Sequence, residues 1–176
     1  SDNVTLHHGA VVSSVPQDLK FKGEITTLEI GESTVVREYA TLNRGTEANG
    51  KTVIGKNCLL MAYSHVAHDC TVGDNVIIAN CGTLGGHVEI DDWAIVGGLV
   101  AVHQFVKIGA HTLLAGFTKA VKDIPPYITA GSNPMKYEGV NVIGLKRRGF
   151  TVEQIDSIKE FYKLLYKSGL NISDAV

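Results

Sequence analysis

The sequence predicts a mainly β protein, a parallel β-helix of hexapeptide repeats followed by a C-terminal α-helical segment. Every sixth residue from Ile30 to Leu114 is Ile, Val or Leu, with Ala48 as the single exception. A small or β-branched residue stands four positions after each of these, and glycine often stands directly after them. This period fits neither an α-helix nor an alternating strand, but it is typical of the short strands and tight bends of a β-helix.

Three segments of this kind would close one triangular coil of about 18 residues, so residues 30–119 would make about five coils. The β-branched residues suit the short strands. The recurring glycines are expected to supply the positive φ of the bends, because glycine adopts that conformation at little steric cost.

The β-helix is expected to cover residues 1–124, with two interruptions. Leu6 and Val12 already keep the hexapeptide phase, and residues 14–25 then break it. This predicts an early coil edge followed by an exposed polar loop. Residues 44–51 keep the count of six but are polar, which predicts a bulge.

The repeat pattern ends shortly before Pro125 and Pro126. Because proline lacks the N–H that a strand ladder needs, residues 125–150 are expected to form an irregular connection. Thr151 and Gln154 resemble a capping box. Residues 151–176 are therefore predicted to hold an amphipathic helix, interpreted as the start of a longer helical domain. The connection also carries the basic cluster of Lys146, Arg147 and Arg148.

The charge, the hydropathy and the cysteine content of the chain argue against several classes of function. The net charge is −2, which leaves no global electrostatic footprint for a nucleic acid or an anionic membrane. No apolar run is long enough for a membrane span. The three cysteines are odd in number and lack CxxC spacing, which favours a reduced, cytoplasmic protein. Cys58 and Cys70 occupy the small-residue column and are interpreted as core residues.

Most histidines of the repeat fall on one predicted face. In a coil of about 18 residues, the segments that begin at Val66, Leu84 and Val102 lie above one another. Three histidines belong to these segments and one is expected at the corner before Val66, whereas His111 lies elsewhere. The four are His65, His68, His87 and His103.

A wall of histidines indicates a polar site, because a histidine near neutrality is the usual general base. Asp69 could orient His68 if the pair lies at a corner, or it could contact His87 one coil further on. The backbone N–H of Gly86 could stabilise an oxyanion, or the glycine could serve only the bend. Scattered surface histidines and a Zn²⁺ site with three convergent nitrogens are the alternatives.

Several motifs resemble the bacterial UDP-N-acetylglucosamine O-acyltransferases, which begin lipid A and hence lipopolysaccharide synthesis. The motifs are HVAHDC at 65–70, LGGH at 84–87, AVHQF at 101–105, GVN at 139–141, GLKRRGF at 144–150 and QDLK at 17–20. The resemblance implies a left-handed β-helix and a cytoplasmic homotrimer with sites between subunits. It implies transfer of a 3-hydroxyacyl chain from acyl carrier protein to the 3-hydroxyl of UDP-N-acetylglucosamine, with neither a cofactor nor a metal.

By the same resemblance, His68 is the general base, Asp69 its orienting carboxylate and Gly86 the oxyanion donor. Ile143 stands where the family often has Glu, so one nucleotide contact is expected to be missing. The remaining matched positions imply substrate binding: His65, His87 and His103 in the site, Gln17, Asp18 and Lys20 near the sugar and the acyl-phosphopantetheine, Gln104, Asn141, Arg147 and Arg148 at the nucleotide, and Gly116 at the far end of the acyl groove.

Three other functions remain open at this point. A related hexapeptide enzyme could acylate an amine on a UDP-sugar. A metalloenzyme similar to γ-class carbonic anhydrases would hold Zn²⁺ on three histidines. A non-catalytic β-helix used for assembly would leave the histidine wall without a purpose.

Overall fold

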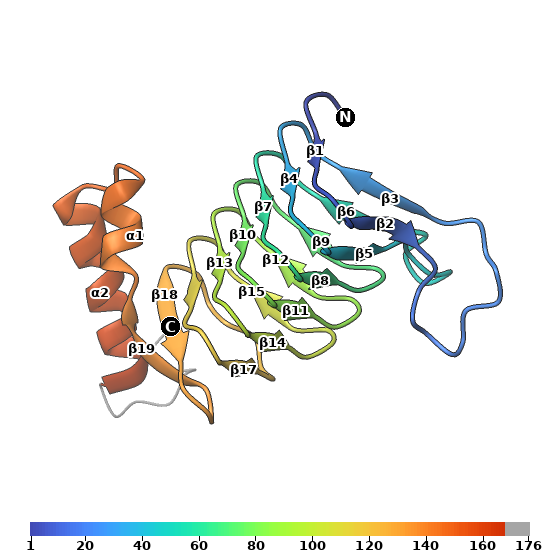
Figure 1. Cartoon of the computed structure of the whole chain (residues 1–176). Helices are drawn as coiled ribbons and strands as arrows, with labels where there is room; N and C mark the ends of the chain where they lie inside the picture. The colour runs from blue at the N-terminus through green and yellow to red at the C-terminus, as the bar shows by residue number, and fades with distance from the viewer. Residues whose placement is uncertain (168–176) are drawn as a thin grey trace.

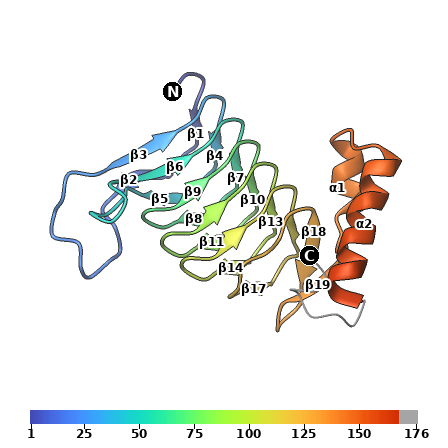
Figure 2. The same cartoon turned by 180° about the vertical axis from the view of Figure 1, so that it is seen from behind.

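The computed structural model describes residues 1–167, which form a triangular prism of short strands with helices at its C-terminal end (Figure 1). Each side of the prism is one sheet. Strands of successive coils pair in parallel, so the chain climbs from the N-terminal end towards the helices. The same prism seen from behind shows its coils stacked in regular order (Figure 2).

The first sheet contains β1 (Thr5–Leu6), β4 (Val35–Val36), β7 (Leu59–Leu60), β10 (Ile77–Ile78), β13 (Ile95–Val96), β16 (Leu113–Leu114), β18 (Ile128–Gly131) and β19 (Lys136–Val140). The second contains β2 (Val11–Ser14), β5 (Thr41–Asn43), β8 (His65–Val66), β11 (Thr83–Leu84), β14 (Ala101–Val102) and β17 (Lys119–Ala120). The third contains β3 (Thr27–Ile30), β6 (Lys51–Ile54), β9 (Thr71–Val72), β12 (Glu89–Ile90) and β15 (Lys107–Ile108).

The aliphatic column forms the interior of the prism. Leu60, Ile78, Val96 and Leu114 pair in register and are fully buried. The small-residue column lies inside as well, and burial raises the pKa of the Cys70 thiol to about 12, so this cysteine is an unreactive core residue. Residues stacked on one another in the regular coils are 18 positions apart. The predicted coil length is confirmed.

The bends differ from the expectation. The glycines that follow the aliphatic column have ordinary φ, and the positive φ occurs two positions later, as at Asn75 (59°) and His87 (61°). Gly97 is needed for another reason: a Cβ there would lie 2.5 Å from the Leu114 carbonyl oxygen of the next coil. Close stacking of the coils, rather than bend conformation, therefore requires glycine at this position.

Two loops leave the prism at one corner, where the second sheet passes to the third. One runs between β2 and β3, the other between β5 and β6. The second loop explains the exception in the aliphatic column, because Ala48 lies exposed in it rather than in a strand. Around this loop, paired residues such as Thr41 and His65 are 24 positions apart.

The connection at 125–150, expected to be irregular, is ordered. β18 pairs in parallel with β16 and then with β19 as an antiparallel hairpin, and α1 (Val142–Arg147) follows. The expectation was wrong because Pro125 and Pro126 lie at a corner just before Tyr127, where the chain turns and no ladder N–H is required.

Helix α2 (Val152–Lys167) begins at the expected capping box. Thr151 N–H donates to Gln154 Oε1 at 2.9 Å, and Gln154 N–H donates to Thr151 Oγ1 at 3.2 Å. The buried Tyr162 donates its hydroxyl to the Pro126 carbonyl at 2.7 Å, which fixes the helix on the last coil. The rest of the predicted 151–176 segment lies outside the described residues. Neither helix within residues 1–167 is long and apolar enough to cross a membrane.

Candidate active site

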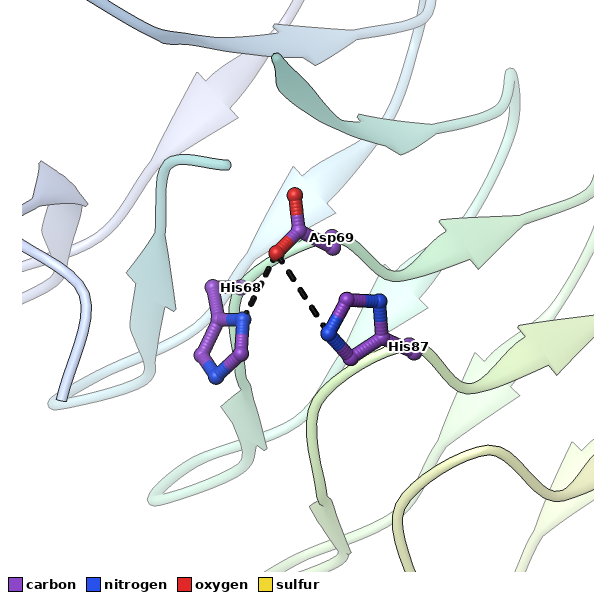
Figure 3. A group of neighbouring side chains, drawn as sticks. All are labelled: His68, Asp69 and His87. Atoms are coloured by element: carbon purple, nitrogen blue, oxygen red, sulfur yellow. Dashed lines mark hydrogen bonds and ion pairs between the residues drawn. The ribbon is translucent and has the colours of Figure 1, made fainter. Parts of the chain in front are cut away.

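His68, Asp69 and His87 meet at the corner between the second and third sheets (Figure 3). His68 and Asp69 lie in the turn from β8 to β9, and His87 lies in the equivalent turn one coil on. Because Val66 pairs with Leu84, Gly86 stacks on His68 and His87 stacks on Asp69. The hexapeptide register alone brings these residues together.

Both contacts considered for Asp69 occur. His68 Nδ1 lies 2.7 Å from Asp69 Oδ2, and His87 Nε2 lies 3.7 Å from the same oxygen. The two imidazole rings are perpendicular, with centroids 5.2 Å apart. The short hydrogen bond makes His68 the direct partner of the carboxylate, whereas His87 is a longer-range neighbour.

Asp69 is held from a second side by the loop between β5 and β6. The Thr46 N–H donates to Oδ1 at 2.8 Å, and the Thr46 hydroxyl donates to Oδ2 at 2.6 Å. The Asp69 side chain is fully buried. Burial raises the pKa of its carboxyl, but the hydrogen bonds from Thr46 and His68 outweigh burial, and the net pKa lies below its ordinary value.

An ionised Asp69 assigns the proton on His68. A carboxylate only accepts hydrogen bonds, so the proton between the two residues lies on His68 Nδ1 and the lone pair lies on Nε2. The His68 side chain is 14% exposed, so Nε2 can be reached. This is the tautomer that a general base needs.

Gly86 lies directly against the His68 ring. A Cβ at this position would be 2.7 Å from His68 Cε1 and 2.8 Å from Nε2. Among the described residues the Gly86 N–H has no hydrogen-bond partner, whereas its carbonyl accepts from Phe105 N–H at 3.0 Å. Glycine therefore leaves room for the imidazole and places a free backbone donor beside it.

The other histidines of the predicted wall are less closely involved. His65 lies on strand β8 rather than at the corner where it was expected, and its Nδ1 contacts the Thr41 hydroxyl at 2.7 Å. Burial lowers the pKa of His65. His103 and Gln104 are exposed, and His103 Nδ1 lies 3.1 Å from the Gln104 carbonyl oxygen. Neither ring is hydrogen-bonded to Asp69.

The early loop closes a pocket at the same corner. Two of its predicted substrate residues, Asp18 and Lys20, line the pocket together with His87, whereas Gln17 is exposed outside it. The guanidinium of Arg44 lies over the Phe21 ring, 5.4 Å from its centroid, and ties the two loops together. The complete lining is Asp18, Lys20, Phe21, Glu24, Thr46, Glu47, Ala48 and His87.

Three of the four predicted nucleotide residues, Asn141, Arg147 and Arg148, lie at a different corner, between the third and first sheets. Gln104 instead lies in the turn from β14 to β15, at the same corner as His68. Asn141 caps α1 by accepting from Gly144 N–H at 3.1 Å and donates to the His111 carbonyl at 2.9 Å. The Arg148 guanidinium lies over Trp93, 5.5 Å from the ring centroid, while Arg147 is exposed. Gly116 follows β16 at the remaining corner. A single chain therefore does not bring Asn141, Arg147, Arg148 or Gly116 to the corner of His68.

Two contributors were missed by reading the sequence alone. They are Thr46, whose hydroxyl donates to Asp69, and Phe105, which is stacked on His87 with ring centroids 4.5 Å apart. The signal for Thr46 was the polar bulge at 44–51, which the register places beside Asp69. The signal for Phe105 was its position one coil after His87.

The zinc alternative receives weaker support than acid–base chemistry. Donor atoms of His68, Asp69 and His87 lie within 4.8 Å of one another, but they comprise two imidazoles and one carboxylate rather than three nitrogens. Asp69 Oδ2 already accepts from the Thr46 hydroxyl and from His68. A donor set committed to such hydrogen bonds suits proton transfer.

Comparison with known sequences gives a consistent result. Residues 51–86 match the bacterial transferase hexapeptide (six repeats) family, and residues 123–176 match the second domain of UDP-N-acetylglucosamine O-acyltransferase. The chain is 53% identical over 172 residues to the acyl-(acyl-carrier-protein)-UDP-N-acetylglucosamine O-acyltransferase of Chlorobaculum parvum. The aligned residues cover 97% of this chain and 65% of the relative. The chain spans about 64% of the length of the curated relative from Paraburkholderia phymatum, at 46% identity and 96% coverage of this chain.

Solved structures show the same architecture. The UDP-N-acetylglucosamine acyltransferase of Bacteroides fragilis is 48% identical, with a TM-score of 0.95 over 98% of this chain and 68% of that chain. The enzyme of Francisella novicida is 39% identical, with a TM-score of 0.96 over 98% of this chain and 64% of that chain. These similarities confirm the left-handed winding that the resemblance implied.

Proposed function

Because the chain belongs to the UDP-N-acetylglucosamine O-acyltransferase family, we propose that it transfers a 3-hydroxyacyl chain from acyl carrier protein to the 3-hydroxyl of UDP-N-acetylglucosamine, the first step of lipid A synthesis. The observation that carries the proposal is the His68–Asp69 hydrogen bond of 2.7 Å beside the free N–H of Gly86. This arrangement supplies a base and an oxyanion donor on one corner of the prism.

In the proposed reaction, the sugar hydroxyl attacks the thioester carbonyl of the acyl carrier protein. His68 Nε2 accepts the hydroxyl proton as the new C–O bond forms, and the Gly86 N–H donates to the resulting oxyanion. Collapse of the tetrahedral intermediate breaks the C–S bond, and His68 returns the proton to the departing sulfur. Asp69 stabilises the imidazolium that forms in between, as a buried carboxylate beside a protonated histidine does.

Substrate binding is assigned to the groups around this corner and to a second subunit. Lys20 and Asp18 line the pocket that includes His87, which supports a place for them near the sugar and the acyl-phosphopantetheine. Gln104 lies at this corner as well, in the turn from β14 to β15, whereas Asn141, Arg147, Arg148 and Gly116 lie at other corners of the chain. We therefore assign the nucleotide and the far end of the acyl groove to sites completed by neighbouring subunits of a homotrimer. The residues in question are Gln104, Asn141, Arg147 and Arg148 for the nucleotide and Gly116 for the acyl chain.

One residue near the proposed nucleotide site lacks a polar group. Ile143 is 68% exposed on α1 and offers no hydrogen-bond donor or acceptor in its side chain to a nucleotide.

The cysteines support a place for the reaction. Cys58, Cys70 and Cys81 are all free thiols, which supports a reducing compartment and thus the cytoplasm.

The test is a transfer assay on the full chain with 3-hydroxyacyl-(acyl carrier protein) and UDP-N-acetylglucosamine. We expect turnover by the unaltered chain and a loss of about 10²- to 10⁴-fold in His68→Ala, because the base is removed. A UDP-sugar with a 3-amino group in place of the hydroxyl is the matched control substrate. Preferential acylation of that amine, or near-normal turnover by a folded His68→Ala variant, would contradict the proposal.

A further inference from the structure

Thr46 is the only residue of the described loop between β5 and β6 whose side chain reaches the Asp69 carboxylate. Its backbone N–H bonds to one carboxylate oxygen, and its hydroxyl bonds to the other. A pair of donors that spans both oxygens sets the plane of the carboxylate as well as its position. Thr46 is only 7% exposed, so water cannot replace these hydrogen bonds easily.

The loop is built to hold Thr46 in this place. Its carbonyl accepts from Gly50 N–H at 2.7 Å, and its hydroxyl oxygen accepts from Ala48 N–H at 3.3 Å. With that lone pair occupied, the hydroxyl hydrogen is directed to Asp69. Asn49 adds a hydrogen bond of 3.2 Å from its side-chain N–H to the Asp69 carbonyl. The loop therefore contacts both the backbone and the side chain of the residue that orients the base.

The hydrogen bonds from Thr46 also compensate the buried negative charge of Asp69. Among the described residues, Asp69 lacks a contact with lysine or arginine, and its buried charge is compensated by Thr46, His68 and the more distant His87. A buried carboxylate with so few partners is sensitive to the loss of any one donor. Without the hydroxyl, Asp69 Oδ2 would keep only the hydrogen bond from His68, and the carboxylate would be held by one Thr46 donor instead of two.

We propose that Thr46 is a positioning residue for the acyl transfer: through its hydrogen bonds to both carboxylate oxygens of Asp69, it keeps that side chain ionised and aligned with His68. The polar loop at this corner thus serves as the support of the catalytic pair as well as a wall of the substrate pocket. This role rests on the proposed function, because Asp69 matters only if His68 acts as a base.

The experiment compares Thr46→Val, Thr46→Ser and Thr34→Val in the full chain. Valine keeps the shape of threonine and loses the hydroxyl, while serine keeps the hydroxyl. Thr34 is the control because its buried hydroxyl bridges coils by donating to the Gly55 carbonyl at 2.8 Å, away from Asp69. Steady-state transfer kinetics are combined with ¹³C NMR titration of the Asp69 carboxyl.

For Thr46→Val we expect kcat to fall about tenfold or more, with KM for the UDP-sugar within about twofold. The pKa of Asp69 should rise relative to the unaltered chain, because a donor to its charged form is lost. Thr46→Ser should restore both quantities, and Thr34→Val should leave both unchanged. If Thr46→Val does not fold, Thr46→Ala replaces it with the same expectations.

The proposal is overturned if the hydroxyl-free variant keeps kcat within about twofold or leaves the Asp69 titration unmoved. It is also overturned if serine fails to rescue the loss, or if Thr34→Val lowers kcat equally. Absence of transfer in the unaltered chain would refute the proposed function instead. The NMR titration would then still decide whether Thr46 controls the ionisation of Asp69.

Discussion

Two corners of the prism use the same backbone for different purposes. At the His68 corner, Asp69 and His87 have φ of 60° and 61°, and at the His111 corner Trp93 and His111 have φ of 62° and 59°. At both corners a histidine N–H donates to a carbonyl of the preceding coil. The His87 N–H donates to the His68 carbonyl at 3.1 Å, and the His111 N–H donates to the Asp92 carbonyl at 3.0 Å. The difference between the corners therefore lies entirely in their side chains and attached loops.

The neighbours decide what each histidine can do. His68 faces a buried carboxylate and a glycine. His111 is stacked between Trp93 and Tyr127, and its Nδ1 lies 3.5 Å from Arg148 Nη1. Burial first and then the positive charge of Arg148 lower the pKa of His111, which therefore favours its neutral form. The comparison shows that a carboxylate hydrogen-bonded to the imidazole distinguishes His68, the proposed base, from His111.

The largest expected contrast comes from exchanging a carboxylate for an amide at each corner. Asp69→Asn should lower kcat by about 10²- to 10⁴-fold, because an amide cannot hold the His68 tautomer or stabilise its imidazolium. Asp92→Asn should keep kcat within about twofold, since its amide oxygen can still accept from Asp74 N–H. Steady-state kinetics on both variants check the contrast. Equal effects at the two corners would contradict it.

A second contrast concerns two turn glycines. Gly86→Ala should lower kcat about 10²-fold, because the new Cβ would displace the His68 ring. Gly98→Ala should keep its kcat, because the nearest atom to a Cβ there is the Asn80 carbonyl oxygen at an ordinary 3.5 Å. Transfer assays with thermal unfolding of both variants are the measurement. A Gly86→Ala variant with normal turnover would show that His68 has freedom to move.

At the His111 corner the expected effects are on stability. Arg148→Ala removes the contact between the guanidinium and Trp93, which should cost about 1 kcal/mol and lower the Tm by about 2–4 °C. Arg148→Lys should recover only part of this loss, because lysine lacks the planar group that stacks on the indole. Thermal unfolding without substrate measures the effect. An unchanged Tm would mean that α1 is held by other contacts.

The smallest effect is the pH dependence that His111 contributes. Its pKa in the folded chain is lowered from the ordinary 6.5, so the unfolded chain takes up the proton first as the pH falls. The stability that neutral His111 contributes is therefore present above about pH 6.5 and is lost as the pH falls towards the folded pKa. The difference in Tm between the unaltered chain and His111→Gln should shrink from pH 7.5 to about 5.5. A constant difference would contradict the lowered pKa.

Much of the architecture could be predicted because it repeats. The aliphatic column, the two loops, the capping box at Thr151 and the stacking of Leu84 on Val66 all follow from local spacing. The strand at Ile128–Gly131 could not be predicted, because prolines normally end strands and only the coil geometry shows that these two lie at a corner. The contact between Thr46 and Asp69 could not be predicted for a related reason, because the position of a loop residue depends on contacts with residues distant in sequence.

The sequence by itself determined which residues are stacked on one another, because each short strand bonds to the equivalent strand of the next coil and the hexapeptide period leaves one register that buries the aliphatic column. The tertiary structure decided which atoms meet. Only the folded corner shows that Asp69 is hydrogen-bonded to His68 at 2.7 Å, that His87 Nε2 lies 3.7 Å from the same oxygen, and that the Thr46 hydroxyl also donates to it. Side-chain direction at a left-handed corner and the path of a loop depend on long-range packing, which no repeat in the sequence encodes.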